Sequence, residues 1–173
     1  MPSGGDVLVL YGLIESDGSP TLRALGSRLG VQHSKVQRAL DRLSEAGIYD
    51  AQRRRIVSHA AEEFLIHALK YLHPVREGAL ARGVPTAWGA APLRDQIRGE
   101  DASPVWPSPH GKVRGPSISP IDLQVVELVD GWPEVAELAA LCDALILGDA
   151  RVRKAAEKHV KARLRRADER RAA

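Results

Sequence analysis

The sequence predicts a mainly helical fold: an N-terminal unit of three helices and a short β-hairpin, followed by a C-terminal helical portion. Three observations lead to this fold class. Apolar residues recur at the helical period between residues 20 and 46 and again after residue 132. A glycine interrupts the first pattern only briefly, as a tight turn between two helices does. Aromatic residues are 4% of the chain, so the core has to be built from aliphatic side chains.

Two consecutive short helices are predicted between residues 20 and 46. Ser19 suits the N-cap of the first helix, Pro20 suits its first position, and Gly30 suits the left-handed conformation that ends it. The buried face of the first helix consists of Leu22, Leu25 and Leu29. The second helix buries Val36, Ala39, Leu40 and Leu43. Its opposite side is polar and basic, which suits the major groove of DNA.

The outward residues of this second helix are the candidate DNA contacts. We expect five of them to face base edges: His33, Ser34, Lys35, Gln37 and Arg38. Arg42 is expected to contact phosphates, together with Thr21 at the start of the first helix.

A β-hairpin is predicted directly after the second helix, which Gly47 ends. Residues 48–50 and 54–57 are expected to be its strands, and residues 51–53 its tip. Three consecutive arginines of this hairpin are expected to contact phosphates or the minor groove: Arg53, Arg54 and Arg55. The alternative is a charged turn that only faces solvent.

A helix of about ten residues is predicted before this pair. It carries apolar side chains from Val7 to Ile14 and is closed by residues 16–18. We expect it to pack across the following two helices as the third helix of the unit.

The stretch LRALGSRLGVQHSKVQRALDRLSEAGI resembles the winged helix-turn-helix family of bacterial transcriptional regulators, broadly its MarR-like and ArsR-like groups. The resemblance is limited to about residues 6–72, and it implies a repressor-like protein that binds DNA as a homodimer on a palindromic operator. One position departs from the family pattern, because Gln32 stands before the recognition helix where a better cap is usual. Helix-turn-helix units also serve as protein-interaction modules, which leaves that alternative open.

Ser58 is predicted to cap a helix over residues 59–72. Its buried face is expected to consist of Ala61, Phe64, Leu65, Ala68, Leu69 and Leu72. His59, Glu63 and His67 follow one another at intervals of four residues on the other side, a spacing that suits a metal ion. Because this is the face where solvated polar residues belong, we predict no metal site and no cofactor.

Residues 74–118 are a Pro/Gly-rich segment between an N-terminal DNA-binding domain, residues 1–73, and a C-terminal helical region, residues 119–173. Helical periodicity fails in this segment, and parts of it look extended. Its two tryptophans, Trp88 and Trp106, indicate that it wraps against the protein. They are candidates for a pocket that holds a small-molecule effector or a partner protein, and the alternative is that they only cover the helical body.

Three helices are predicted in the C-terminal region. The first starts at residues 119–122, although its β-branched content leaves a strand open. The second spans residues 133–147 and holds Cys142 on its apolar face, where a buried thiol is expected. Asp149 caps the third, which runs to about residue 166 with a thin apolar stripe, is otherwise basic, and is followed by a tail expected to fray.

Charge is segregated along the chain, with net charges of +2 over residues 1–60, −6 over residues 61–150 and +7 over residues 151–173. Basic ends point to nucleic acid rather than to a membrane, because no basic helix carries a broad apolar face. The apolar run near the N-terminus lacks the cations of a signal peptide, and no stretch is long enough to span a bilayer. We therefore expect a soluble, cytoplasmic protein.

No Gly-rich phosphate loop and no spacing of a nucleophile and a base can be found, so an enzyme is not expected. The sequence predicts a sequence-specific DNA-binding transcriptional regulator, homodimeric on double-stranded DNA with a palindromic operator. The alternative is an antitoxin-like or adaptor module that uses the winged helix and the middle segment to hold a partner protein.

Overall fold

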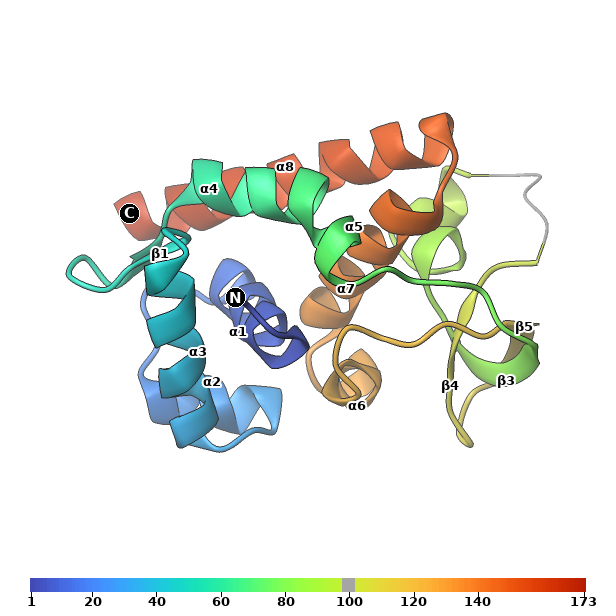
Figure 1. The fold of residues 1–173 in the computed structure, drawn as a ribbon, viewed down its shortest axis with the longest axis horizontal. Helices are drawn as coiled ribbons and strands as arrows, with labels where there is room; N and C mark the ends of the chain where they lie inside the picture. The colour runs from blue at the N-terminus through green and yellow to red at the C-terminus, as the bar shows by residue number, and fades with distance from the viewer. Residues whose placement is uncertain (98–101) are drawn as a thin grey trace.

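The computed structural model describes residues 1–97 and 102–173 and shows a mainly helical fold with two small antiparallel sheets (Figure 1). The helices are α1 (Gly4–Glu15), α2 (Leu22–Leu29), α3 (His33–Glu45), α4 (Ser58–Glu63), α5 (Leu69–Leu72), α6 (Gln124–Gly131), α7 (Pro133–Leu147) and α8 (Ala150–Ala172). The strands are β1 (Tyr49–Asp50), β2 (Arg55–Ile56), β3 (Leu80–Pro85), β4 (Val105–Pro107) and β5 (Val113–Pro116). The mainly helical character predicted from the sequence is confirmed.

Helix α1 lies in the middle of the helical body and is buried on all sides. Every residue from Asp6 to Ile14 is buried, and the helix contacts α2, α3, α7 and α8. A helix that is apolar around its whole circumference needs neighbours on every side. Helix α7 is buried in the same way between α1, α6 and α8. The N-terminal and C-terminal helices therefore share one hydrophobic core.

Two predicted helix starts are wrong by a few residues. Helix α2 is capped by Thr21 rather than Ser19, because the Thr21 hydroxyl accepts the Ala24 N–H at 3.1 Å. Helix α6 starts at Gln124, whose N–H donates to the side chain of Asp122 at 2.9 Å. The strand that the sequence left open in this region is a helix.

Helix α8 continues to Ala172, so the fraying expected after residue 166 is wrong. Arg170 donates to the Ile14 carbonyl at 2.6 Å, and Arg171 donates to the Leu13 carbonyl at 3.1 Å. These carbonyls belong to the last turn of α1, where they have no partner within the helix and where a cation is favourable. Part of the basic charge of α8 therefore stabilises the end of α1.

The helix predicted over residues 59–72 is interrupted by a π-turn, Phe64–Ala68, which joins α4 to α5. The Ser58 hydroxyl does not cap it but donates to Asp168 of α8 at 2.6 Å. A π-turn takes one extra residue, so the side chains after it are rotated by about 100° from the regular pattern. For this reason Leu72, which the sequence predicts to be buried, is 37% exposed.

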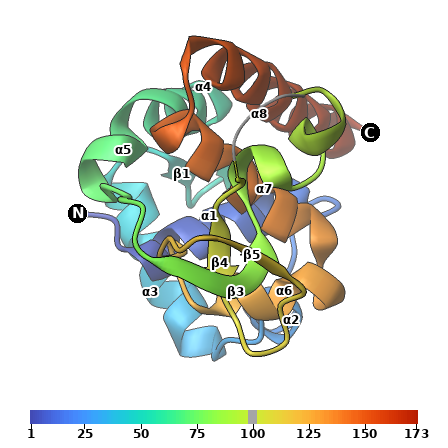
Figure 2. The same cartoon turned by 90° about the vertical axis from the view of Figure 1, so that its right-hand side faces the viewer.

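The middle segment contains a three-stranded sheet that the sequence does not predict, although the stretches that look extended do contain its strands. β3 lies between β4 and β5 and is antiparallel to both. Figure 1 shows this sheet at the opposite end of the molecule from β1 and β2, and Figure 2 looks onto it. Glycine allows the strands to approach, since a Cβ at Gly83 would lie 2.1 Å from the Trp106 carbonyl oxygen.

Candidate nucleic-acid interface

The turn between α2 and α3 fixes how α3 is presented. Gly30 has a φ of 71°, and its N–H donates to carbonyls in the last turn of α2. A Cβ at Gly26 would lie 2.7 Å from the Val31 carbonyl oxygen, so only glycine allows this close approach. Leu25, Leu29 and Val36 are buried between the pair and α1. The opposite side of α3 is left in solvent.

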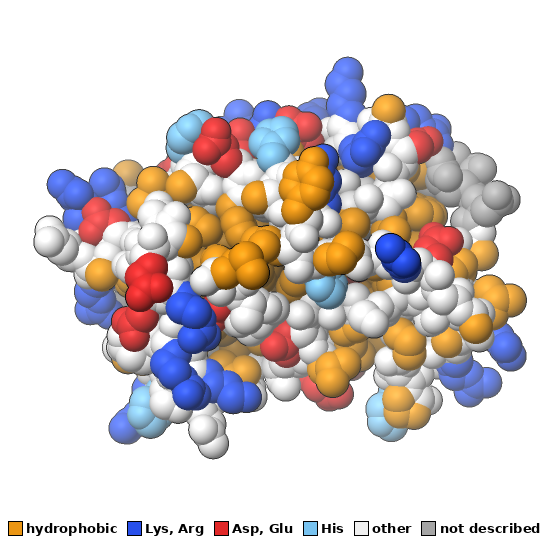
Figure 3. All heavy atoms as spheres, in the orientation of Figure 1, with side chains coloured by type: hydrophobic (Ala, Val, Ile, Leu, Met, Phe, Trp, Pro, Cys, Tyr) orange, Lys and Arg blue, Asp and Glu red, His pale blue; other side chains and the backbone are white. Residues whose placement is uncertain are grey.

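All five residues predicted to face base edges are exposed on the first half of α3: His33, Ser34, Lys35, Gln37 and Arg38. Gln37 donates to Asp41 at 2.8 Å, which orients its amide. The exposed acids of this helix, Asp41 and Glu45, lie in its second half, so the first half is the cationic one. Figure 3 shows Lys and Arg side chains gathered over the part of the molecule where α2 and α3 lie. As expected, Gln32 makes no capping bond with its side chain.

Two of the residues predicted to contact phosphates have partners within the chain. Arg42 donates through Nε and Nη2 to the two carboxylate oxygens of Asp6, at 2.8 and 2.6 Å, and Asp6 is only 1% exposed. Burial disfavours the Asp6 anion, but the hydrogen bonds from Arg42 and Ser3 outweigh burial and hold the pKa of Asp6 below its ordinary value. The Thr21 hydroxyl is used by its cap. Arg42, whose side chain is 39% exposed, and Thr21 thus have structural roles, and their phosphate contacts stay predictions.

The hairpin is anchored to the segment that leads into α2. Its strands are only two residues long, shorter than predicted, and they pair Tyr49 with Ile56. Ser19 donates to the Arg54 carbonyl at 3.0 Å, and Arg54 Nη2 lies 3.4 Å from the Pro20 carbonyl oxygen. These contacts fix the position of the hairpin relative to the α2–α3 pair.

The three hairpin arginines differ in the contacts that they make within the chain. Arg53 pairs with Asp50 at 2.9 Å, yet its side chain remains 68% exposed. Arg54, with a φ of 52°, reaches back toward residue 20. Arg55 is exposed beside the end of α8, where Arg171 also lies. All three guanidinium groups therefore lie at the surface of the hairpin, with Arg53 the most neutralised.

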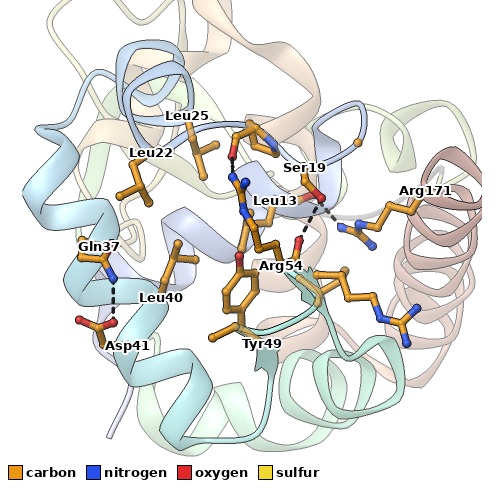
Figure 4. Close-up of a pocket in the computed structure, with 15 residues that line it drawn as sticks. Leu13, Ser19, Leu22, Leu25, Gln37, Leu40, Asp41, Tyr49, Arg54 and Arg171 are labelled. Carbon is orange, nitrogen blue, oxygen red and sulfur yellow. Dashed lines mark hydrogen bonds between the residues drawn. The ribbon is translucent and has the colours of Figure 1, made fainter.

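A hollow of about 280 Å³ separates α3 from the hairpin (Figure 4). Its apolar side is formed by Leu13, Leu22, Leu25 and Leu40. Tyr49 and Arg54 line it from the hairpin, and Gln37 and Asp41 line it from α3. Gln37 and Asp41 of α3 and Arg54 and Arg55 of the hairpin thus border one depression of the surface.

The two tryptophans of the middle segment are placed differently. Trp106 is 1% exposed, and its indole N–H donates to Asp143 of α7 at 2.8 Å. The same carboxylate oxygen accepts the Thr86 hydroxyl at 2.7 Å. Trp88 is half-buried, and its indole nitrogen finds no hydrogen-bond partner among the described residues. Trp106 therefore pins the sheet to α7, as a cover for the helical body requires.

Asp143 is a buried carboxyl that sequence reasoning missed. Burial raises its pKa from 3.8 to about 7, although the hydrogen bonds from Thr86 and Trp106 oppose this rise. Next to it, Cys142 is buried as predicted, and burial raises the pKa of its thiol to about 12. The sequence signal for Asp143 was an acid inside the apolar run of residues 138–147. The signal for the buried Asp6 was its position three residues after Ser3, as in a capping box at the start of α1.

His59 and Glu63 lie 3.7 Å apart and are both exposed. Within residues 1–97 and 102–173, no group of three His, Cys, Asp or Glu side chains converges in a way that suits a metal ion. In the same ranges, none of the helices combines the length and the apolarity needed to cross a membrane.

Comparison with known proteins gives no matching family model, no matching curated protein and no matching solved structure.

Proposed function

We propose that the protein is a sequence-specific DNA-binding transcriptional regulator of the winged helix-turn-helix type, which acts as a homodimer on a palindromic operator. In this proposal α1, α2 and α3 are the three helices of the unit, and β1 and β2 form the wing. The first half of α3 enters the major groove, and the wing arginines contact the backbone beside it.

One observation carries the proposal. Lys35 and Arg38 are exposed on the first half of α3, and no acidic side chain among the described residues forms an ion pair with either. The hollow between α3 and the hairpin is lined by Gln37 of this half-helix and by Arg54 and Arg55, whereas Lys35 and Arg38 line a separate hollow beside Arg42 and Gln124. A polar, cationic half-helix with arginines beside it matches what base edges and phosphates require. The acids Asp41 and Glu45 lie on the second half of α3, and Asp41 lines this hollow next to Gln37, to which it is hydrogen-bonded.

The proposal is tested by selecting bound DNA from a random pool and titrating the selected sequence with wild type and Arg38→Ala. A bidentate arginine–guanine contact is worth about 1–3 kcal/mol, so the variant should lose about tenfold or more in discrimination at one base pair. Arg114→Ala removes an equally exposed arginine at the far sheet and serves as the matched control. If the pool yields no preferred sequence, or if both variants discriminate like wild type, the proposal is wrong.

The second candidate is an adaptor that holds a partner protein, and one observation favours it. The register of β3 and β5 places Arg82 directly opposite Arg114, and both are exposed. Like charges directly opposite each other are unfavourable in a sheet unless an anion lies between them. This candidate predicts a stable complex with an acidic protein segment that Arg82→Glu abolishes, whereas the regulator predicts that Arg82→Glu leaves DNA affinity unchanged.

A further inference from the structure

An apolar groove of about 610 Å³ lies where the N-terminus, the end of α3 and the α4–α5 helix meet. Its floor includes Ile48, Ala60 and Phe64, and its edge includes Tyr71 and Leu72. In Figure 3 hydrophobic side chains gather in the centre of this face, over the region where Figure 1 draws α4 and α5. A contiguous apolar patch of this kind marks an interaction surface more often than a scattered set of apolar residues does.

Two side chains at the edge of this groove are exposed although they are large and apolar. Tyr71 is 77% exposed and Leu72 is 37% exposed, whereas Leu69 after the same π-turn is 2% exposed. A regular helix would have turned Leu72 into the core. The π-turn therefore accompanies the loss of burial at Leu72, and Tyr71 forms an aromatic knob beside the groove.

We propose that a second copy of the chain covers this face. The α4–α5 helices of the two copies pack antiparallel about a two-fold axis, and Tyr71 of each copy inserts into the groove of the other. A two-fold interface uses the same surface on both copies, so it needs a knob and a hole on one surface. Tyr71 and the groove that it borders satisfy this condition.

The charges along the helix select the antiparallel arrangement. Glu63 is exposed on the N-terminal side of His67, and Lys70 is exposed on the C-terminal side. Antiparallel packing centred near His67 brings Glu63 of each copy toward Lys70 of the other, whereas parallel packing would bring like charges together. Such complementarity fixes register and orientation. Lys70 also lies over the Tyr71 ring at 5.0 Å, so the cation accompanies the knob.

The same arrangement suits the proposed function, on which the inference rests for its biological role. In Figure 1 the α4–α5 helix runs across the view, and α3 lies below it. A two-fold axis that reverses α4–α5 runs roughly vertically in that view, so it keeps both α3 helices on the lower side of the dimer. Two recognition helices on one side are what a palindromic site requires.

The test is sedimentation velocity on the full chain without DNA, from micromolar to several hundred micromolar protein. We expect wild type to dimerise and Tyr71→Arg to raise the dimer Kd at least about tenfold. Leu80→Arg places the same charge at another exposed apolar residue, 65% exposed on β3, and should leave the Kd unchanged. Thermal unfolding should confirm that both variants fold, because both side chains are largely exposed. Glu63→Lys and Lys70→Glu should each weaken the dimer, and the double variant should restore it.

Each outcome decides the matter. If the wild-type protein stays monomeric, so that this face serves another partner, the inference is wrong. It is also wrong if the Tyr71→Arg variant dimerises like the wild type. Failure of the charge exchange to restore the dimer overturns the antiparallel arrangement. A chain that dimerises but selects no DNA sequence refutes the proposed DNA binding and leaves the dimer. A monomer that selects a single half-site refutes the dimer, including the homodimer of the proposed function, and leaves sequence-specific DNA binding.

Discussion

Replacing Asp143 by Asn should change how the stability of the protein depends on pH. The pKa of Asp143 is about 7 in the folded chain and near 3.8 when the chain unfolds, so between these values the folded state keeps a proton that the unfolded state releases. The contribution of Asp143 to the free energy of unfolding is therefore largest below about pH 4. It falls as the pH rises and stops changing above about pH 7. The gap between the two pKa values corresponds to about 4 kcal/mol.

The Asn variant keeps an oxygen that accepts from Thr86 and Trp106, but it does not titrate. Urea unfolding of both proteins between about pH 4 and about pH 8 measures the effect as the difference in their free energies of unfolding. The Asp6–Arg42 pair acts in the opposite direction, because the lowered pKa of Asp6 means that its contribution is lost as the pH falls. It is present in both proteins and cancels. We expect the free energy of unfolding of the wild type to fall by about 4 kcal/mol relative to that of the variant across this pH range. A difference between the two free energies that does not change with pH refutes the reasoning.

Three further predictions follow from single contacts. Trp106→Ala should lower the melting temperature by roughly ten degrees, as expected for the loss of a core aromatic side chain, and Trp88→Ala should lower it less because Trp88 is only half-buried. Equal falls in melting temperature for the two variants would contradict this prediction. Replacing the hairpin arginines one at a time should flatten the salt dependence of DNA binding by about 0.9 log unit per log salt for each lost phosphate contact, with Arg53 giving the least because Asp50 already pairs with it. Arg170→Ala should cost about 1–3 kcal/mol in denaturant unfolding by leaving the Ile14 carbonyl without its partner, whereas exposed Arg166→Ala on the same helix should be nearly neutral.

Local patterns predicted those parts of the fold that local physics decides. The Pro133–Leu147 helix and the cap at Asp149 agree with the structure, because a proline at the first turn and a carboxylate cap are short-range signals. The apolar stripe of α8 was also predictable from spacing, since Val152, Ala156, Val160 and Leu164 are all buried.

Features that depend on partners distant in sequence were not predictable in this way. The π-turn has no short-range signature in residues 58–72, so the exposure of Leu72 could not be anticipated. The sheet of β3, β4 and β5 depends on pairs of residues that are far apart in sequence, from Pro85 with Val105 to Leu80 with Pro116. Its glycines and prolines are typical of loops. In the candidate site, the exposure of Lys35 and Arg38 followed from the helical wheel, whereas the commitment of Arg42 to Asp6, thirty-six residues away, did not.

Helix α8 shows why basic charge alone does not identify a DNA contact. Ten of its residues are Lys or Arg, and by sequence it is the most basic part of the chain. Yet Arg163 is buried between Glu15 and Glu137, and Arg170 and Arg171 donate to the end of α1. Asp168 of the same helix accepts from Ser58, which directly follows the hairpin. The last turns of α8 therefore stabilise the end of α1 and the segment that follows the hairpin. A substitution there should alter DNA binding by moving α1 and the hairpin rather than by removing phosphate contacts.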